Sequence, residues 1–164
     1  MLRDLYAYMR TQGTIAAILN AIINPALAWL GNRRMEFASL WGDHSMVLDT
    51  AATAVILSLL VSLFVTAGVR RELAAGRLAA AGASARTGSW LSRLPSNPWA
   101  LGLSLGVALA CILVAALLGL FQLMGIPGLS FAGFALFKVV YTSLLGVAVT
   151  RWVIRRQVLA APGA

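Results

Sequence analysis

The segment SFAGFALFKVVYTSLLGVAVTRWVI, residues 130–154, decides the fold of this chain. It is long and apolar enough to cross a bilayer, for which about 20 residues suffice, yet it contains Lys138, the only lysine in the protein. Counted from Ser130 at about 1.5 Å per residue, the Lys138 backbone lies roughly 12 Å below one membrane surface. Tyr141 and Thr142 follow on the same helical face. The segment therefore predicts a transmembrane helix that carries a short polar stripe.

The composition of the whole chain is that of a membrane protein. Of its 164 residues, 60% are hydrophobic and 11% are charged, and the mean hydropathy is +0.87. In soluble domains about a quarter of the residues are charged. The length leaves room for four spans and their connections, and for no separate soluble domain. We expect one membrane domain, residues 1–164, folded as an all-α bundle of four transmembrane helices with up-down topology.

Three further apolar segments complete the expected spans: residues 14–31, 47–69 and 99–123. The first contains Asn20 and Asn24, which share a helical face with small residues, a pattern that packs helices in lipid. The connection between the first two spans, residues 32–46, is expected to be a short exposed loop.

Small residues mark two faces for close helix packing. In the third span, Gly102 and Gly106 form a GxxxG pair that lets another backbone approach, with a second copy of the chain as one candidate partner. In the second span, small residues recur at every fourth position: Thr50, Ala54, Ser58, Ser62 and Thr66.

The placement of arginines predicts the orientation. The N-terminal and C-terminal segments carry two and three arginines, against two in the first connection and none in the third. Because basic residues are retained on the cytoplasmic side, both termini and the loop 70–97 are expected in the cytoplasm. We expect the loop arginines to contact anionic lipid or a partner protein. They are Arg70, Arg71, Arg77, Arg86 and Arg93.

Other chemistry is sparse. One histidine, one cysteine and five acidic residues offer no ligand spacing for zinc or haem, and no phosphate-binding glycine loop follows a strand. We therefore expect no enzymatic activity, no metal and no cofactor. The net charge of +8 comes from basic residues between apolar spans, where it reports topology rather than binding to nucleic acid.

Polar residues at similar depths form the candidate site. Asn24 and Lys138 lie well inside their spans, and Asp49 lies near the start of its own. We expect Asp49 to pair with the Lys138 ammonium and Asn24 to hydrogen-bond to it, because a charge inside a bilayer needs partners. An intramembrane ionisable residue indicates a functional site by default. The competing interpretation is an ion pair that only fixes helix register.

The chain resembles an uncharacterised family of small bacterial inner-membrane proteins. It departs from that family in lacking prolines in the second and fourth spans. The resemblance implies four helices and no known activity, and it places the Asn, Asp and Lys positions in the family pattern. It rests on Asn20, Asn24, Ala28, Trp29, Leu40, Trp41, Gly42, Asp49, Thr50, Thr53, Arg70, Arg71, Leu129, Ser130, Phe131, Phe137 and Lys138.

Two functional hypotheses follow from these residues. The first is a small transporter or channel-like protein with a polar cavity open to the outer side, where the cation favours a small anion or a proton-coupled solute. The second is a non-catalytic structural or regulatory subunit, joined to a second copy or to a membrane complex. The cavity of the first hypothesis is formed by Lys138, Asp49, Asn24, Asn20, Tyr141 and Thr142.

Overall fold

The computed structural model describes residues 4–31, 36–42, 45–79 and 90–161. Within these ranges, four long helices are each long and apolar enough to cross a membrane. A short 3-10 turn precedes the third of them, and two three-residue strands form the only sheet in the described ranges. The predicted all-α class with four candidate spans is thus confirmed. The helices are α1 (Leu5–Gly31), α2 (Met46–Ala74), α4 (Pro98–Met124) and α5 (Phe131–Ala160), and the turn is η1 (Trp90–Arg93).

The helices begin where the sequence supplies a cap. Ser45, Asn97 and Ser130 each accept a hydrogen bond from a first-turn amide, at 2.9–3.3 Å. Such a bond satisfies an amide that the helix itself leaves unpaired. Helix α4 ends at Gly125, whose φ of 65° is a left-handed conformation that glycine adopts without strain. These caps explain why α2, α4 and α5 begin within one residue of the predicted spans.

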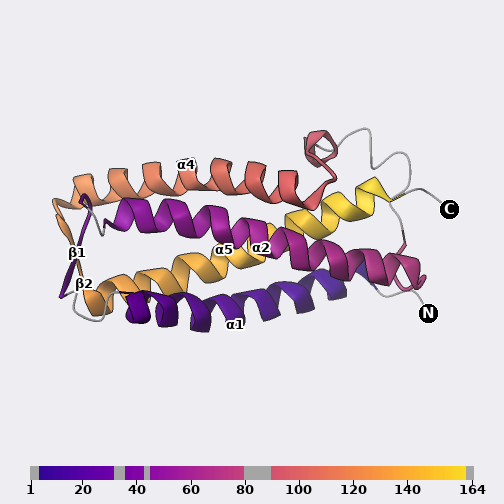
Figure 1. Ribbon diagram of the computed structural model, residues 1–164, viewed down its shortest axis with the longest axis horizontal. Coiled ribbons are helices and arrows are strands. Elements are labelled where there is room, and N and C mark those ends of the chain that lie inside the picture. The colour runs from indigo at the N-terminus through magenta and orange to yellow at the C-terminus, as the bar shows by residue number, and fades with distance from the viewer. Residues whose placement is uncertain (1–3, 32–35, 43–44, 80–89, 162–164) are drawn as a thin grey trace.

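The four long helices are packed in the order α4, α2, α5, α1. Helix α2 lies between α4 and α5, and α1 packs along α5 (Figure 1). Near its start α1 also meets α2, where a β-carbon added to Gly68 would lie 3.5 Å from the Tyr8 hydroxyl. The start of α1 and the end of α5 lie at one end of the bundle, which we call the terminal end. The opposite end carries the two strands, and we call it the sheet end.

The sheet joins two connections at the sheet end. Strand β1 (Phe37–Ser39) pairs antiparallel with β2 (Gly128–Ser130), with Phe37 opposite Ser130. The expected plain loop at residues 32–46 is therefore wrong for its middle part. Gly128 makes the pairing possible, because a β-carbon there would collide with the Ala38 carbonyl oxygen and the Phe37 ring. A strand of three residues is too short to show alternation in the sequence.

Helix α4 packs on α2 through its two glycines. A β-carbon added to Gly102 would lie 2.7 Å from the Leu59 Cα, and one added to Gly106 would lie 2.8 Å from the Val55 Cα. The predicted close-packing face of α2 meets these glycines with Ser58 and is buried throughout. The GxxxG pair therefore packs inside the chain, against α2, and not against a second copy, which was one candidate partner.

Segment 90–97 is attached to α5 at the terminal end. The Arg156 Nε donates to the Leu94 carbonyl at 2.7 Å, and the Gln157 Nε2 donates to the Ser96 carbonyl at 3.1 Å. The Trp90 ring meets the Trp152 ring edge to face, with centroids 6.2 Å apart. These contacts hold the turn η1 against the bundle and so fix where α4 begins.

Candidate functional site

A groove runs between α1 and α2, whose backbones approach each other far less than those of α1 and α5 do. Its volume is about 740 Å³, and α5 contributes Lys138 and Thr150 to its lining. A cavity of this size suits a drug-sized molecule. Most of its walls are large apolar side chains that are about half exposed or more: Ile15, Leu19, Ile23 and Leu27 from α1, and Ile56, Leu60 and Phe64 from α2.

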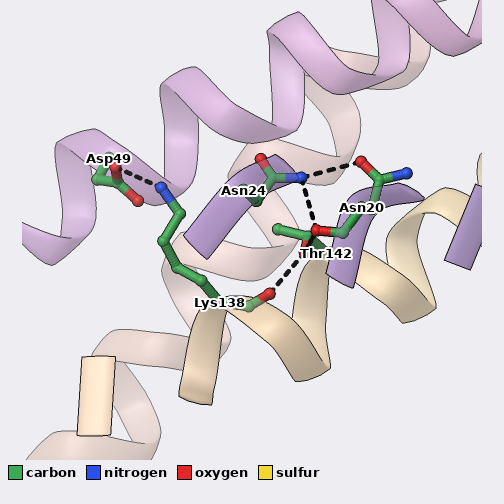
Figure 2. Close-up of polar contacts among 5 residues, drawn as sticks. All are labelled: Asn20, Asn24, Asp49, Lys138 and Thr142. Atoms are coloured by element: carbon green, nitrogen blue, oxygen red, sulfur yellow. Dashed lines mark hydrogen bonds and ion pairs between the residues drawn. The ribbon is translucent and has the colours of Figure 1, made fainter. Parts of the chain in front are cut away.

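An ion pair lies at the sheet end of this groove. Lys138 extends from α5 toward α2, and its Nζ lies 2.8 Å from the Asp49 Oδ1 (Figure 2). The predicted pairing of these two residues is confirmed. The Lys138 side chain is 4% exposed and the Asp49 side chain 28%. On its other side the ammonium lies 5.5 Å from the centroid of the Phe134 ring. The carboxylate thus covers the ammonium.

The position of Asp49 in its helix favours a negative charge, and within the described residues its second oxygen accepts no hydrogen bond. Asp49 lies in the first turn of α2, where the helix dipole favours a carboxylate. Among the described residues, the Asp49 Oδ2 and the Thr50 and Tyr141 hydroxyls are buried without a hydrogen-bond partner. A buried polar atom without a partner is costly, but the Ser58, Thr66 and Thr150 hydroxyls are in the same state, so this feature is not confined to the ion pair.

The two asparagines of α1 line the groove but use their amide nitrogens within their own helix. The Asn20 Nδ2 donates to the Ala16 carbonyl at 2.7 Å, and the Asn24 Nδ2 donates to the Asn20 Oδ1 at 2.9 Å. Figure 2 shows the Asn24 amide nitrogen directed at Asn20. The expected hydrogen bond between Asn24 and Lys138 is therefore not made, and the amides serve mainly α1 itself.

Tyr141 and Thr142 do not line the groove, which corrects their predicted place in the cavity. Thr142 is fully buried, and its Oγ1 donates to the Lys138 carbonyl at 2.6 Å and lies 3.3 Å from the Asn20 carbonyl on α1. The Tyr141 ring packs on Phe137 with centroids 4.8 Å apart. Four of the six predicted site residues therefore lie along the groove, and two lie behind it.

Sequence reasoning missed two residues that shape the site. Thr53 lines the groove one helical turn after Asp49, and this spacing of four is a signal that could have found it. Gly146 on α5 faces Asn20, because a β-carbon there would lie 2.6 Å from the Asn20 Nδ2. Only the positions of α1 and α5 relative to each other reveal the role of Gly146.

The described basic residues of segment 70–97 lie at the terminal end, far from the ion pair. Arg70, Arg71 and Arg93 are exposed, and Arg77 pairs with Glu72 at 2.8 Å. The hydrogen bond from Arg77 to Glu72 and the charge of Glu72 raise the pKa of Arg77. Arg86 lies outside the described residues. The exposed guanidinium groups are placed where they can contact phosphate groups.

Comparisons of the chain with protein-family models, with curated proteins and with solved structures find no significant match. The geometry of the groove is therefore the basis for a functional proposal.

Proposed function

We propose that the protein is a multi-pass protein of the bacterial inner membrane that transports a small solute or ion through the groove between α1 and α2. The observation that carries this proposal is the Lys138–Asp49 pair at the edge of an open groove. Burying an ion pair in a low-dielectric interior is costly. A pair that served only to fix helix register would be best enclosed on all sides, whereas the Asp49 side chain stays 28% exposed.

The orientation supports a site that is reached from outside the cell. The exposed arginines of segment 70–97 gather at the terminal end, and Lys138 lies toward the sheet end. Because positive residues stay on the cytoplasmic side, we place both termini in the cytoplasm, and the exposed arginines against anionic lipid of that leaflet. The ion pair then lies in the outer half of the membrane.

Helix α1 is the element whose movement would change access to the groove. Among the long helices, α5 is the one against which α1 makes most of its contacts. The Ser143 hydroxyl approaches the Ala17 carbonyl at 3.3 Å, and Gly146 leaves room for Asn20. A shift of α1 along α5 would widen or narrow the groove without disturbing the α2–α4 interface.

Cysteine labelling tests whether the groove is open to water. Cys111, the only cysteine, is first replaced by alanine, and Thr53→Cys is then introduced into the groove wall. In intact cells, a membrane-impermeant thiol reagent is expected to label the new cysteine from outside. The control is Val107→Cys, which lies on α4 away from the groove lining and is half exposed, and which should remain unlabelled because lipid covers it. If the Thr53→Cys variant reacts no faster than the Val107→Cys variant, the transport proposal fails.

One observation favours the second candidate, a structural or regulatory subunit. The large apolar side chains along α1 and α2, with Phe64 74% exposed, form a groove that also fits a transmembrane helix of a second copy or of a membrane complex. In that case the thiol of the Thr53→Cys variant would be protected in the native membrane and would become reactive after purification in detergent. The labelling experiment therefore separates the two functions.

A further inference from the structure

The two charges of the ion pair are not equally open to the groove. The Lys138 side chain is 4% exposed and lies between Asp49 and the Phe134 ring, whereas the Asp49 side chain is 28% exposed. A molecule that enters the groove therefore meets the carboxylate before the ammonium. Building on the proposed function, we propose that the substrates of the groove are lipophilic cations, molecules of drug size that carry an amine or ammonium group on an apolar body.

The carboxylate has capacity for a second partner. An ionised carboxylate offers about four acceptor positions on its two oxygens. In the described part of the chain, the Asp49 Oδ1 accepts one hydrogen bond, from Lys138, and the Oδ2 accepts none. The Oδ2 is itself buried, so a cation in the groove reaches it only when the Asp49 side chain turns.

The surroundings of Asp49 fit the rest of such a molecule. Large apolar side chains of α1 and α2 form the walls, including Ile23 and Ile56. The other lysine or arginine in the described lining is Arg71, near the end of α2. Its backbone lies roughly 33 Å from that of Asp49 at about 1.5 Å per residue, so it does not repel a cation bound there.

An anion is less well served by this geometry. The sequence alone suggested that Lys138 would favour a small anion or a proton-coupled solute, but an anion would have to displace the Asp49 carboxylate or lie beside it. Like charges at short distance repel strongly where water is scarce. Because Asp49 is more exposed than Lys138, we expect a cationic ligand in place of an anionic one.

The test uses two probes of the same shape and opposite charge, tetraphenylphosphonium and tetraphenylborate. Binding of each to the full-length protein in one neutral detergent is measured by calorimetry. We expect Asp49→Asn to weaken phosphonium binding at least ~10-fold, which is about 1.4 kcal/mol, and not to weaken borate binding. For each probe, the dissociation constant of the variant is divided by that of the wild type. This ratio cancels the partition of the probe into the micelle.

Two control variants distinguish a folding defect from a specific loss of cation binding. Asp4→Asn changes an exposed acid outside the groove and should leave both affinities unchanged. Asp49→Glu keeps the charge and should keep the preference for phosphonium, even if its melting temperature falls. If Asp49→Asn does not fold, the wild-type protein is titrated with salt instead. An attraction between the phosphonium and the Asp49 charge predicts that salt weakens phosphonium binding more than borate binding.

The outcomes separate this inference from the transport proposal. If the Thr53→Cys variant is labelled from outside but the borate binds as well as the phosphonium, or Asp49→Asn changes neither affinity, the cation class is wrong and the transport proposal stands. If the Thr53→Cys variant is not labelled and neither probe binds, the groove belongs to lipid or to a partner helix, and both proposals fail.

Discussion

The two faces of α2 differ in how closely a neighbouring helix approaches. Toward α4, glycines bring the backbones together, so that an added β-carbon at Gly106 would lie 2.8 Å from the Val55 Cα. Toward α1, large side chains such as Ile56 and Phe64 are more than half exposed and a groove remains. Apolar surface alone does not drive helix association in lipid, whereas small residues do. The groove is thus a consequence of residue size on one face of α2.

The largest effect is expected at the ion pair that joins α2 to α5 where the groove ends. Asp49→Leu strands the Lys138 charge, which is 4% exposed, and should cost ~3–5 kcal/mol. Lys138→Met should cost less, because the remaining carboxylate can turn to the groove. The double variant should regain most of the stability. Unfolding in mixed micelles measures all three, and unchanged stability of both single variants would show that the pair contributes nothing to the fold.

The second-largest loss of stability is expected where α4 packs closely on α2. Gly106→Leu places four carbons against the α2 backbone and should lower the free energy of unfolding by about 3 kcal/mol. The matched control is Gly119→Leu, in the same helix, where an added β-carbon meets nothing within 4 Å; it should change stability by less than about 0.5 kcal/mol. Thermal unfolding in detergent compares them. Equal losses would mean that the glycine contact is incidental.

A smaller effect is expected at the polar link between α1 and α5. Thr142→Val keeps the shape of the side chain and removes its hydroxyl from the Lys138 and Asn20 carbonyls. Hydrogen bonds between helices in membranes average ~0.6 kcal/mol, so a loss near that value should appear in a chemical unfolding curve. Thr11→Val, at an exposed position of α1, serves as the control. A loss as large as that of Gly106→Leu would contradict the minor role assigned to this bond.

The smallest effect is expected on the open face. Phe64 is 74% exposed, so Phe64→Ala should change the free energy of unfolding by less than about 0.5 kcal/mol. Phe134→Ala removes the same side chain from a site that is 2% exposed and should cost ~3–5 kcal/mol. If Phe64→Ala proved as harmful as Phe134→Ala, the groove would be closed by protein and the contrast between the two faces would disappear.

The sequence predicts the features that depend on the residues of a single helix. Length and hydropathy locate the spans, and the caps Ser45, Asn97 and Ser130 set their starts. The pairing of Lys138 with Asp49 follows from the cost of an isolated charge in lipid.

Apart from the Lys138–Asp49 pair, which joins α5 to α2, the features that depend on two helices could not be predicted. The spacing of Lys138 and Thr142 puts both on one face of α5, but the long lysine side chain reaches α2 while the short threonine stays against α1. The groove depends on α1 packing mainly against α5, and no pattern within α1 specifies that neighbour.

The packing of α1 has a consequence for the order of synthesis. Helix α1 is made first, and its partner α5 is made last, roughly 100 residues later, which corresponds to a delay on the order of 5–20 s during translation. If the helices enter a membrane in the order in which they are made, α1 spends that period without the helix that finally covers Asn20 and Asn24. Because both amide nitrogens donate within α1 itself, the helix satisfies these donors while it waits. The asparagines are thus suited to a helix that must persist alone before its bundle exists.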